Sequence, residues 1–282
     1  MTLQMTDNSP RAYPPETTEG WYAFHQVFAW NRSALRAIHA GELASLQRLA
    51  IERLDSMAVS ATGGWTGVVP LVGSRGDVMF IHFRATLDAI GDAQRELASE
   101  ALFDVLTPVY SFLSVTEAGL YHATAQLAKE ASERGGQVGD DSYRQQMQQR
   151  IDAERASPHV QRRLFPMQPD DMPYVCFYPM SKKRDVGANW YALPVEQRSQ
   201  LMMAHGMTGR GYAGQIVQVI TGAIGLDAWE WGVTLFAKDP LAFKKIVTDM
   251  RFDEVSAKYA EFGEFFVGKR TSPRDWLLGG AG

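Results

Sequence analysis

The second half of the chain alternates short apolar runs with segments that carry helical spacing. Residues 174–182 alternate as a strand does, and residues 194–206 have Pro194 in a first helical turn and Gly206 just past the end. The remaining elements are predicted as strand, strand, helix and strand, at 214–221, at 229–237, from Asp239-Pro240 onward, and at 261–268. This order, βαββαβ, is the ferredoxin-like pattern.

The first half repeats this order. Ser33 is of a residue type that caps helices and precedes a long helical pattern, and the composition of residues 74–77 indicates a turn between two strands. The predicted strand, helix, strand, strand, helix and strand lie at 21–30, 33–57, 67–73, 78–85, 86–103 and 109–117. We therefore expect an α+β fold of two tandem ferredoxin-like halves that form one dimeric α+β barrel-like subunit.

Polar stretches precede and separate the two halves. Residues 1–18 are predicted to be a loose N-terminal tail. The two halves span residues 19–122 and 161–282, and the second half carries the candidate site. Residues 123–160 form a polar insertion that is either helical or mobile, with poor order expected around residues 135–141.

Composition narrows the class of protein. Hydrophobic residues make up 45% of the chain and charged residues 21%, which is typical of a globular protein with a core. The net charge of −4 gives no argument for a nucleic-acid partner, and no apolar run is long enough to span a bilayer. Cys176 is the only cysteine, which excludes an internal disulfide and a cysteine-based zinc site. A reducing cytoplasm is therefore expected.

Among the six histidines, His205 is the candidate metal ligand. No pair of histidines has the spacing of a helical zinc or di-iron motif. His205 lies at the predicted end of a helix, where Leu201 and Met202 would share its apolar face, and a single histidine is what haem iron needs. The alternative is a structural histidine that favours the helix end because a cation is stabilised there.

The strand at 174–182 carries a second set of candidate residues. Tyr178, Met180 and Lys182 share one face with Tyr174 and Cys176, which fits a wall against a large amphipathic ligand better than a dry core. Its alternative is an edge strand with Lys182 in solvent. Upstream, Arg162-Arg163 could pair with a carboxylate or be solvated.

Gln218 is the third candidate. Strand alternation places it on the face of Ile216 and Ile220, in a strand whose two faces both look buried. A buried amide needs partners, so Gln218 either bonds to the backbone or points into a ligand cavity. The chain has no phosphate-binding loop of the Walker type and no nucleophile elbow.

At these residues the sequence resembles the chlorite-dismutase-like superfamily, and within it the coproheme decarboxylases of the non-actinobacterial type. The matching runs cover roughly residues 160–270. They include Phe177–Arg184, Asn189-Trp190-Tyr191, Met203–Gly206, Gly209-Arg210, Gln215–Gln218, Gly225–Trp231 and Met250–Ser256. The first half matches more loosely, through Gly20-Trp21-Tyr22, His25 and Ser111–Glu117.

The resemblance implies a homopentameric, peroxide-dependent enzyme of haem biosynthesis. It would convert two propionates of iron-coproporphyrin III to vinyl groups and give haem b, by way of a tyrosyl radical, and a transient contact with coproporphyrin ferrochelatase fits that pathway. The implied roles are His205 as the axial iron ligand, Tyr178 as the catalytic radical residue, and Arg163, Met180, Lys182, Gln218, Trp229 and Ser256 as the residues that bind the porphyrin.

Two departures and two rival functions stay open. The family often has Tyr where this chain has Phe112, and either Arg162 or Arg163 could be the propionate contact. A chlorite dismutase would need an arginine where this chain has Gln218, whose amide carries no charge to hold an oxyanion. A non-catalytic haem carrier or sensor would need His205 alone and would leave the Tyr178–Lys182 face unexplained.

Overall fold

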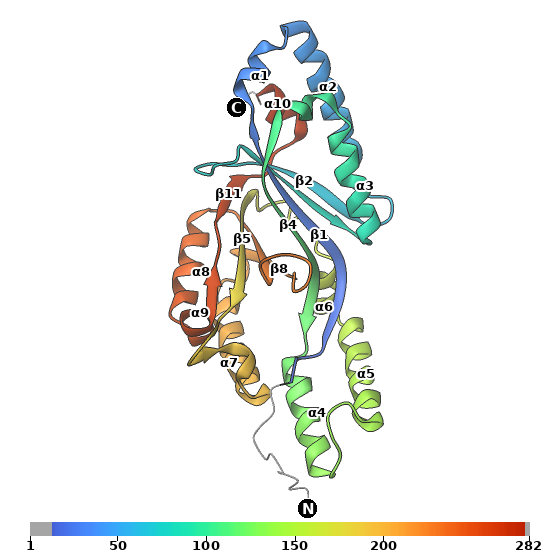
Figure 1. Cartoon of the computed structure of the whole chain (residues 1–282), viewed down its shortest axis with the longest axis vertical. Coiled ribbons are helices and arrows are strands. Elements are labelled where there is room, and N and C mark those ends of the chain that lie inside the picture. The colour runs from blue at the N-terminus through green and yellow to red at the C-terminus, as the bar shows by residue number, and fades with distance from the viewer. Residues whose placement is uncertain (1–12, 280–282) are drawn as a thin grey trace, which may run out of the picture.

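The computed structural model describes residues 13–279. Its strands form one antiparallel nine-stranded sheet in the order β10-β5-β9-β8-β4-β1-β3-β2, with β11 also paired to β5 (Figure 1). The strands are β1 (Thr17–Trp30), β2 (Gly64–Pro70), β3 (Val78–Arg84), β4 (Leu106–Gly119), β5 (Tyr174–Lys182), β8 (Ile216–Gly222), β9 (Trp231–Ala237), β10 (Ala260–Phe262) and β11 (Phe266–Lys269). A separate hairpin pairs β6 (Arg184–Asp185) with β7 (Ala188–Asn189). The α+β class with an antiparallel sheet is thus confirmed.

The two halves have the same order of strands and meet in the middle of the sheet. The first half reads β4-β1-β3-β2 and the second reads β10-β5-β9-β8. They join where β4 pairs with β8, at Val115↔Gly222 and Thr116↔Thr221. At the far edges, isolated bridges between Val68 and Thr271 and between Leu71 and Gly268 bring β11 beside β2.

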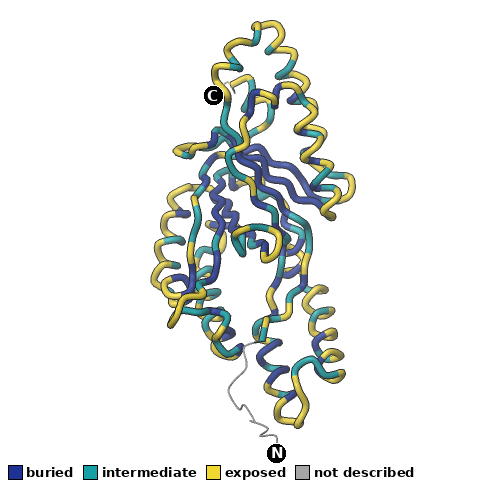
Figure 2. Tube along the Cα trace, in the orientation of Figure 1, coloured by how far each residue is buried: buried dark blue, intermediate teal, exposed yellow. Residues whose placement is uncertain are grey.

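Helices cover mainly one face of this curved sheet. They are α1 (Arg32–Ala37), α2 (Ala40–Met57), α3 (Leu87–Ala98), α4 (Tyr121–Glu133), α5 (Asp141–Ala156), α6 (Pro158–Leu164), α7 (Val195–Arg210), α8 (Leu241–Arg251), α9 (Glu254–Tyr259) and α10 (Pro273–Leu278). The inner face holds one apolar cluster that includes Trp65, Phe112 and Phe177. The strands are buried over much of their length, and most exposed residues lie on the helices and loops (Figure 2). The outer face holds two others, one under α2 and α3 and one under α8. Within residues 13–279, no helix is both long and apolar enough to cross a membrane.

Most predicted strands are present, and several predicted helix ends are wrong. The helix predicted over 33–57 is two helices, α1 and α2, separated by extended backbone at Ile38 and His39. Asn31, rather than Ser33, caps α1, and its side chain accepts from Ala34 N. The break turns residues of both helices, such as Leu35 and Leu46, toward one apolar cluster.

The second half departs from prediction at two helices and one strand. Helix α7 continues through Gly206 to Arg210, because its contacts with α4, α8 and α9 outweigh the cost of a mid-helix glycine. The predicted strand at 261–268 is interrupted and forms β10 and β11, and the short helix α9 precedes it. The longer α7 and the added α9 change the surroundings of His205.

The polar insertion is helical. Residues 121–164 form α4, α5 and α6, and α4 packs against α7. Around residues 135–141, where the sequence predicts poor order, the structure has a turn in which Asp140 caps α5 and pairs with Arg134. Of the predicted tail, residues 1–12 lie outside the described residues, whereas Thr17 and Thr18 already belong to β1.

Candidate active site

Three of the predicted residues line the outer face of β5. Tyr178 pairs with Val233, which pairs with Ile220, and Met180 pairs with Trp231, which pairs with Gly222. Residues paired across antiparallel strands point to the same face, and residues two apart on a strand do so as well. Tyr178, Met180 and Lys182 therefore share the face that is covered by the helices of the second half, as predicted.

His205 faces a carboxylate from the start of α9. Its Nδ1 lies 2.9 Å from Asp253 Oδ2. Because a carboxylate only accepts, Nδ1 carries the proton, and Nε2 keeps a lone pair that a metal can bind. The side chain of His205 is 26% exposed, so Nε2 is not sealed in the core. His205 thus lies within a helix rather than at its end, and its orientation is set by hydrogen bonding.

Asp253 holds several groups at once. As the N-cap of α9 its Oδ1 accepts from the backbone N–H groups of Val255 and Ser256. The hydroxyl of Ser256 donates to Asp253 Oδ2 at 3.2 Å, on the same oxygen that His205 contacts. Ser256, predicted to bind the porphyrin, therefore supports the partner of His205 in this structure.

Gln218 lies on β8, and its amide approaches the face of α7 that carries His205. A Cβ added to Gly209, one turn after His205, would lie 3.4 Å from the methyl carbon of Met250 and 4.0 Å from Gln218 Oε1. The prediction that Gln218 is buried is wrong, because its side chain is exposed near the start of β8. Among the described residues it has no hydrogen-bond partner, so the backbone alternative does not hold.

Lys182 is a buried cation without an ion pair in the part of the chain that the structure describes. It is 7% exposed, and its Nζ lies 4.7 Å from the centre of the Trp190 ring. Burial lowers its pKa to about 8, and Asp253 and Glu230 act against that shift. The carboxylate of Glu230 accepts from the backbone N–H of Lys182 at 2.7 Å. The three ammonium donors remain available to a carboxylate from outside the chain.

Tyr178 stands in an aromatic stack. Its ring lies 4.3 Å from Phe265, nearly parallel, and 6.0 Å from Phe262. Arg251 covers the Phe262 ring at 3.7 Å. Burial raises the pKa of Tyr178 well above its ordinary value. The phenol therefore stays protonated at all physiological pH values, and it gives up an electron only together with its proton.

Arg163 and Trp229 lie apart from this set in different ways. Arg163, in α6, is exposed, and its positive charge lowers the pKa of Glu117 at the end of β4. Trp229 precedes β9 and packs with Pro179, Gly263 and the inner cluster, so the structure does not bring it to the Tyr178 face. Trp231 occupies that face instead, and its indole N–H donates to Glu117 Oε1 at 2.9 Å.

Sequence reasoning missed four residues that shape this face: Glu117, Trp231, Arg251 and Asp253. Of these, Asp253 could have been found from the sequence, because Asp followed by Glu254 and an apolar residue is a helix-start pattern. The other three lie on β4, β9 and α8, which are far apart in the sequence, and they are recognised only when the fold brings these elements together.

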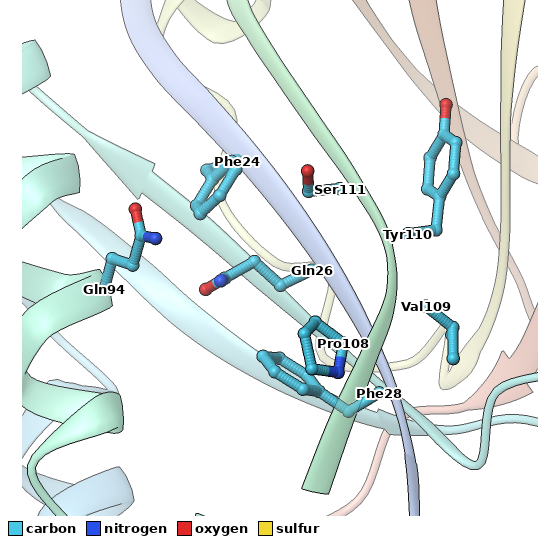
Figure 3. A pocket seen from close by; sticks show the side chains of 8 residues that line it. All are labelled: Phe24, Gln26, Phe28, Gln94, Pro108, Val109, Tyr110 and Ser111. Carbon is cyan, nitrogen blue, oxygen red and sulfur yellow. The ribbon is translucent and has the colours of Figure 1, made fainter.

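Two cavities lie outside this face. One, of about 350 Å³, is on the first half, where Gln26 and Gln94 point toward each other between Phe24, Phe28 and Pro108 (Figure 3). The other, of about 360 Å³, is lined by Arg184, Asn189, Tyr191, Ile224 and Glu230. Neither contains His205 or Tyr178, and the second touches the site only through Glu230.

The donor set fits an iron porphyrin better than a bare metal ion. Within residues 13–279, no group of three or more His, Cys, Asp or Glu side chains could hold an ion. A metal bound by His205 alone must bring its other ligands with it, as porphyrin iron does. The buried Lys182 and the exposed Arg163 supply cations for its carboxylates.

Comparison with known proteins agrees with this geometry. The chain is 39% identical over 256 residues to the coproheme decarboxylase of Staphylococcus saprophyticus, covering 90% of this chain and 93% of that protein. It is 37% identical to a haem-binding protein from Thermus thermophilus, with a TM-score of 0.76 over 95% of this chain and 100% of the other.

A mutant chlorite dismutase from Candidatus Nitrospira defluvii shares the fold, at 16% identity and a TM-score of 0.69 over 93% of this chain and 95% of that one. The model of the chlorite dismutase family matches residues 47–271. The chain therefore belongs to the chlorite dismutase family.

Proposed function

We propose that the chain is a coproheme decarboxylase. Its substrate is iron-coproporphyrin III, two propionates of which become vinyl groups, so that haem b is the product. The observation that carries the proposal is one outer face with an oxidisable phenol, Tyr178, beside a buried cation without an acidic partner, Lys182. The 39% identity to the Staphylococcus saprophyticus decarboxylase supports the same reaction.

Each decarboxylation removes two electrons and one proton from a propionate. With hydrogen peroxide as oxidant, one propionate, one peroxide and one proton give one vinyl group, carbon dioxide and two water molecules. When bound, the iron porphyrin supplies the reaction with peroxide, and this chemistry is largely its own. The chain supplies binding, orientation and a hydrogen-atom acceptor.

His205 would hold the iron through Nε2, because Asp253 holds Nδ1. Lys182 attracts the carboxylate of a reacting propionate and places its carbon chain beside Tyr178 and Met180. Tyr178, once oxidised to its neutral radical, would take a hydrogen atom from the propionate β-carbon. The carboxylate would then leave as carbon dioxide, and the second electron would pass to the iron porphyrin, which together with peroxide supplies both oxidising equivalents.

The remaining groups bind and support the porphyrin. Arg163 would contact another propionate, and Gln218, whose amide lies near Gly209 one turn beyond His205, would face the bound porphyrin. Ser256 supports the site by donating to Asp253. Trp229 supports it from the inner face of the sheet, where it packs against the apolar cluster. An uncharged amide at Gln218 is unsuited to holding a chlorine oxyanion, which favours decarboxylation over chlorite breakdown.

The proposal also covers the fold of the subunit, its oligomeric state, its cellular compartment and a partner protein. The shared strand order and the bridges between β2 and β11 support two ferredoxin-like halves in one dimeric α+β barrel. We further propose a homopentamer in a reducing cytoplasm, where the buried thiol of Cys176 stays free, and a transient contact with the ferrochelatase that makes the substrate.

One experiment tests the reaction directly. The purified chain is loaded with iron-coproporphyrin III and titrated with hydrogen peroxide, and the products are identified by mass spectrometry. We expect loss of two carboxyl groups in sequence, through a three-propionate intermediate. Bleaching of the porphyrin without loss of carbon dioxide would contradict the proposal.

A further inference from the structure

Gln26, in the first half, occupies the position that matches Tyr178 in the second half. Strands β3 and β9 are each seven residues long, and each pairs with the first strand of its own half. The third residue of β3 is Phe80, which pairs with Gln26 of β1. The third residue of β9 is Val233, which pairs with Tyr178 of β5. Both pairs lie on the outer face, under the helices of their own half.

A cavity of about 350 Å³ opens at Gln26, between β1, β4 and α3 (Figure 3). Phe24 and Phe28 lie two residues before and after Gln26 on the same strand face, and Ser111 pairs with Gln26 from β4. Gln94 approaches from α3. The volume lies at the lower end of the range for small-molecule pockets, roughly 300–1,000 Å³.

The amide of Gln26 has an unmet hydrogen-bonding need. The residue is 8% exposed, and its Oε1 is enclosed without a hydrogen-bond partner among the described residues. Figure 3 shows this amide directed toward the amide of Gln94 across the cavity. A buried amide oxygen without a donor is costly, and a ligand with an N–H group would supply the missing bond. A half-turn about the last side-chain bond would present the N–H groups of Gln26 instead.

The chemistry of this cavity differs from that of the matching place in the second half. Lys182 follows Tyr178 by four positions on β5, whereas Trp30 follows Gln26 by four positions on β1. None of the residues that line the cavity is charged. A carboxylate would therefore be desolvated there without a cation, which is unfavourable. The lining suits an uncharged ligand that exchanges hydrogen bonds with an amide and has a flat apolar part.

We propose that this cavity is a second binding site, for a small uncharged planar molecule that carries an amide-like pair of donor and acceptor. The amides of Gln26 and Gln94 bind the polar pair. The rings of Phe24 and Phe28 contact the flat part. The inference does not depend on the proposed reaction, because every residue that lines the cavity belongs to the first half.

The test compares two probes of the same size and different charge. Nicotinamide is a flat ring with one primary amide, and nicotinate has the same ring with a carboxylate. Both are titrated by ligand-observed NMR against the full chain with Lys182→Met, so that neither probe is drawn to the open cation of the second half. We expect nicotinamide to bind with a Kd on the order of 1 mM, as suits so small a ligand. Nicotinate should bind at least about tenfold more weakly, because its charge finds no partner.

Substitutions in the same background assign the binding to the cavity. Gln26→Leu removes the amide at similar size and should weaken nicotinamide binding about three- to tenfold, the effect of one lost hydrogen bond. Its denaturation midpoint should not fall, because Oε1 has no partner to lose. Gln94→Ala should weaken binding by a smaller factor, since Gln94 is exposed. The matched control is Gln149→Leu on the exposed surface of α5, which should leave the affinity unchanged.

The possible results separate a ligand site from a structural amide. Absence of nicotinamide binding, equal binding of nicotinate, or equal affinity in Gln26→Leu would each overturn the inference. A lower denaturation midpoint in Gln26→Leu with unchanged nicotinamide affinity would show that the amide serves the fold alone. Failure of the parent chain to bind coproporphyrin III would overturn the proposed function and would leave this inference standing.

Discussion

Arg84 in the first half and Lys182 in the second are both buried cations on the outer face of the sheet, at 5% and 7% exposure. Arg84 donates to the carbonyl oxygens of Trp65 and Phe83 and to the Thr66 hydroxyl, at 2.7 to 2.8 Å. The ammonium of Lys182 lies over the face of Trp190 and has no ion pair in the described residues. Burial of a charge therefore does not identify a site, whereas unused donors on a buried charge do.

Two histidines repeat this contrast. His82 is fully buried, and its Nδ1 shares a hydrogen bond with the Thr66 hydroxyl; burial lowers its pKa to about 3. His205 is partly exposed and has its Nδ1 held by a carboxylate. Nδ1 of each histidine is thus held by a neighbouring oxygen, but His82 is sealed in the core and Nε2 of His205 is not.

The largest expected effect comes from replacing each of the two histidines. His205→Ala should weaken binding of iron-coproporphyrin III by at least about 100-fold, since even outer partners of metal ligands are worth roughly 10–100-fold. Metal-free coproporphyrin III should bind as before, because only the iron contact is lost. His82→Ala should destabilise the fold and leave both affinities nearly unchanged. Persistence of the iron–histidine stretch in the resonance Raman spectrum of His205→Ala would show that another residue holds the iron.

The second expected effect is on chemistry alone. Tyr178→Phe keeps the ring in its stack with Phe265, so iron-coproporphyrin III should bind within about twofold of the parent. The variant should form no three-propionate intermediate on titration with peroxide, because phenylalanine has no O–H to lose. Tyr110→Phe is the matched control, since its buried hydroxyl has no partner among the described residues. Haem b formed at the parental rate by Tyr178→Phe would remove the radical role.

A third pair of variants, at the two buried cations, compares the loss of folding stability with the loss of porphyrin binding. Arg84→Met should lower the free energy of unfolding by about 2–4 kcal/mol, because three acceptors lose a buried charged donor. Lys182→Met has no such bonds to lose and should cost little stability while weakening coproporphyrin III binding about tenfold. Denaturation midpoints and fluorescence titration measure the two effects. Equal losses of stability in both variants would contradict the distinction drawn between the two cations.

The charge of Lys182 also predicts how porphyrin binding and folding stability depend on pH. Its pKa is lowered from 10.5 to about 8, so it is charged below pH 8 in the folded chain and loses its charge above it. Coproporphyrin III should therefore bind more weakly as the pH rises through about 8. Stability should run the other way and increase with pH between about 8 and 10.5, where the unfolded chain binds more protons than the folded one. Lys182→Met should abolish both slopes, and an unchanged binding slope in that variant would assign it to another group.

The smallest effect is expected at Gln218. Its exposed amide can touch a bound oxidant, but it cannot accept a proton as a base would. Gln218→Ala should keep substantial decarboxylation, with the rate lowered by less than about tenfold. Complete loss of turnover, with porphyrin binding intact, would give this residue a larger role than the one proposed.

The sequence predicted the strands of the site better than its helices. Alternation placed β5 at 174–182, because a strand buried on both faces and bounded by turns has few other interpretations. The end of α7 could not be predicted, since its last turn lies beside Met250 of α8 and Gln218 of β8, contacts that the sequence does not reveal. Trp229 precedes β9, which begins at Trp231, so alternation could not place its side chain. Gln218 looked buried because neighbouring apolar residues do not reveal that the helices leave this end of β8 uncovered.

Helix α9 is only six residues long, and the carboxylate that starts it also orients His205. So short a helix is marginal by itself and persists through its cap and its packing. Transient opening of α9 would release Asp253 from His205 and leave the imidazole free to turn or to exchange its tautomer. If His205 binds the iron as proposed, its readiness to do so would then be coupled to a local unfolding equilibrium. Slow amide exchange across residues 254–259 would mark a pocket assembled in advance, and fast exchange would mark one that is completed as the porphyrin binds.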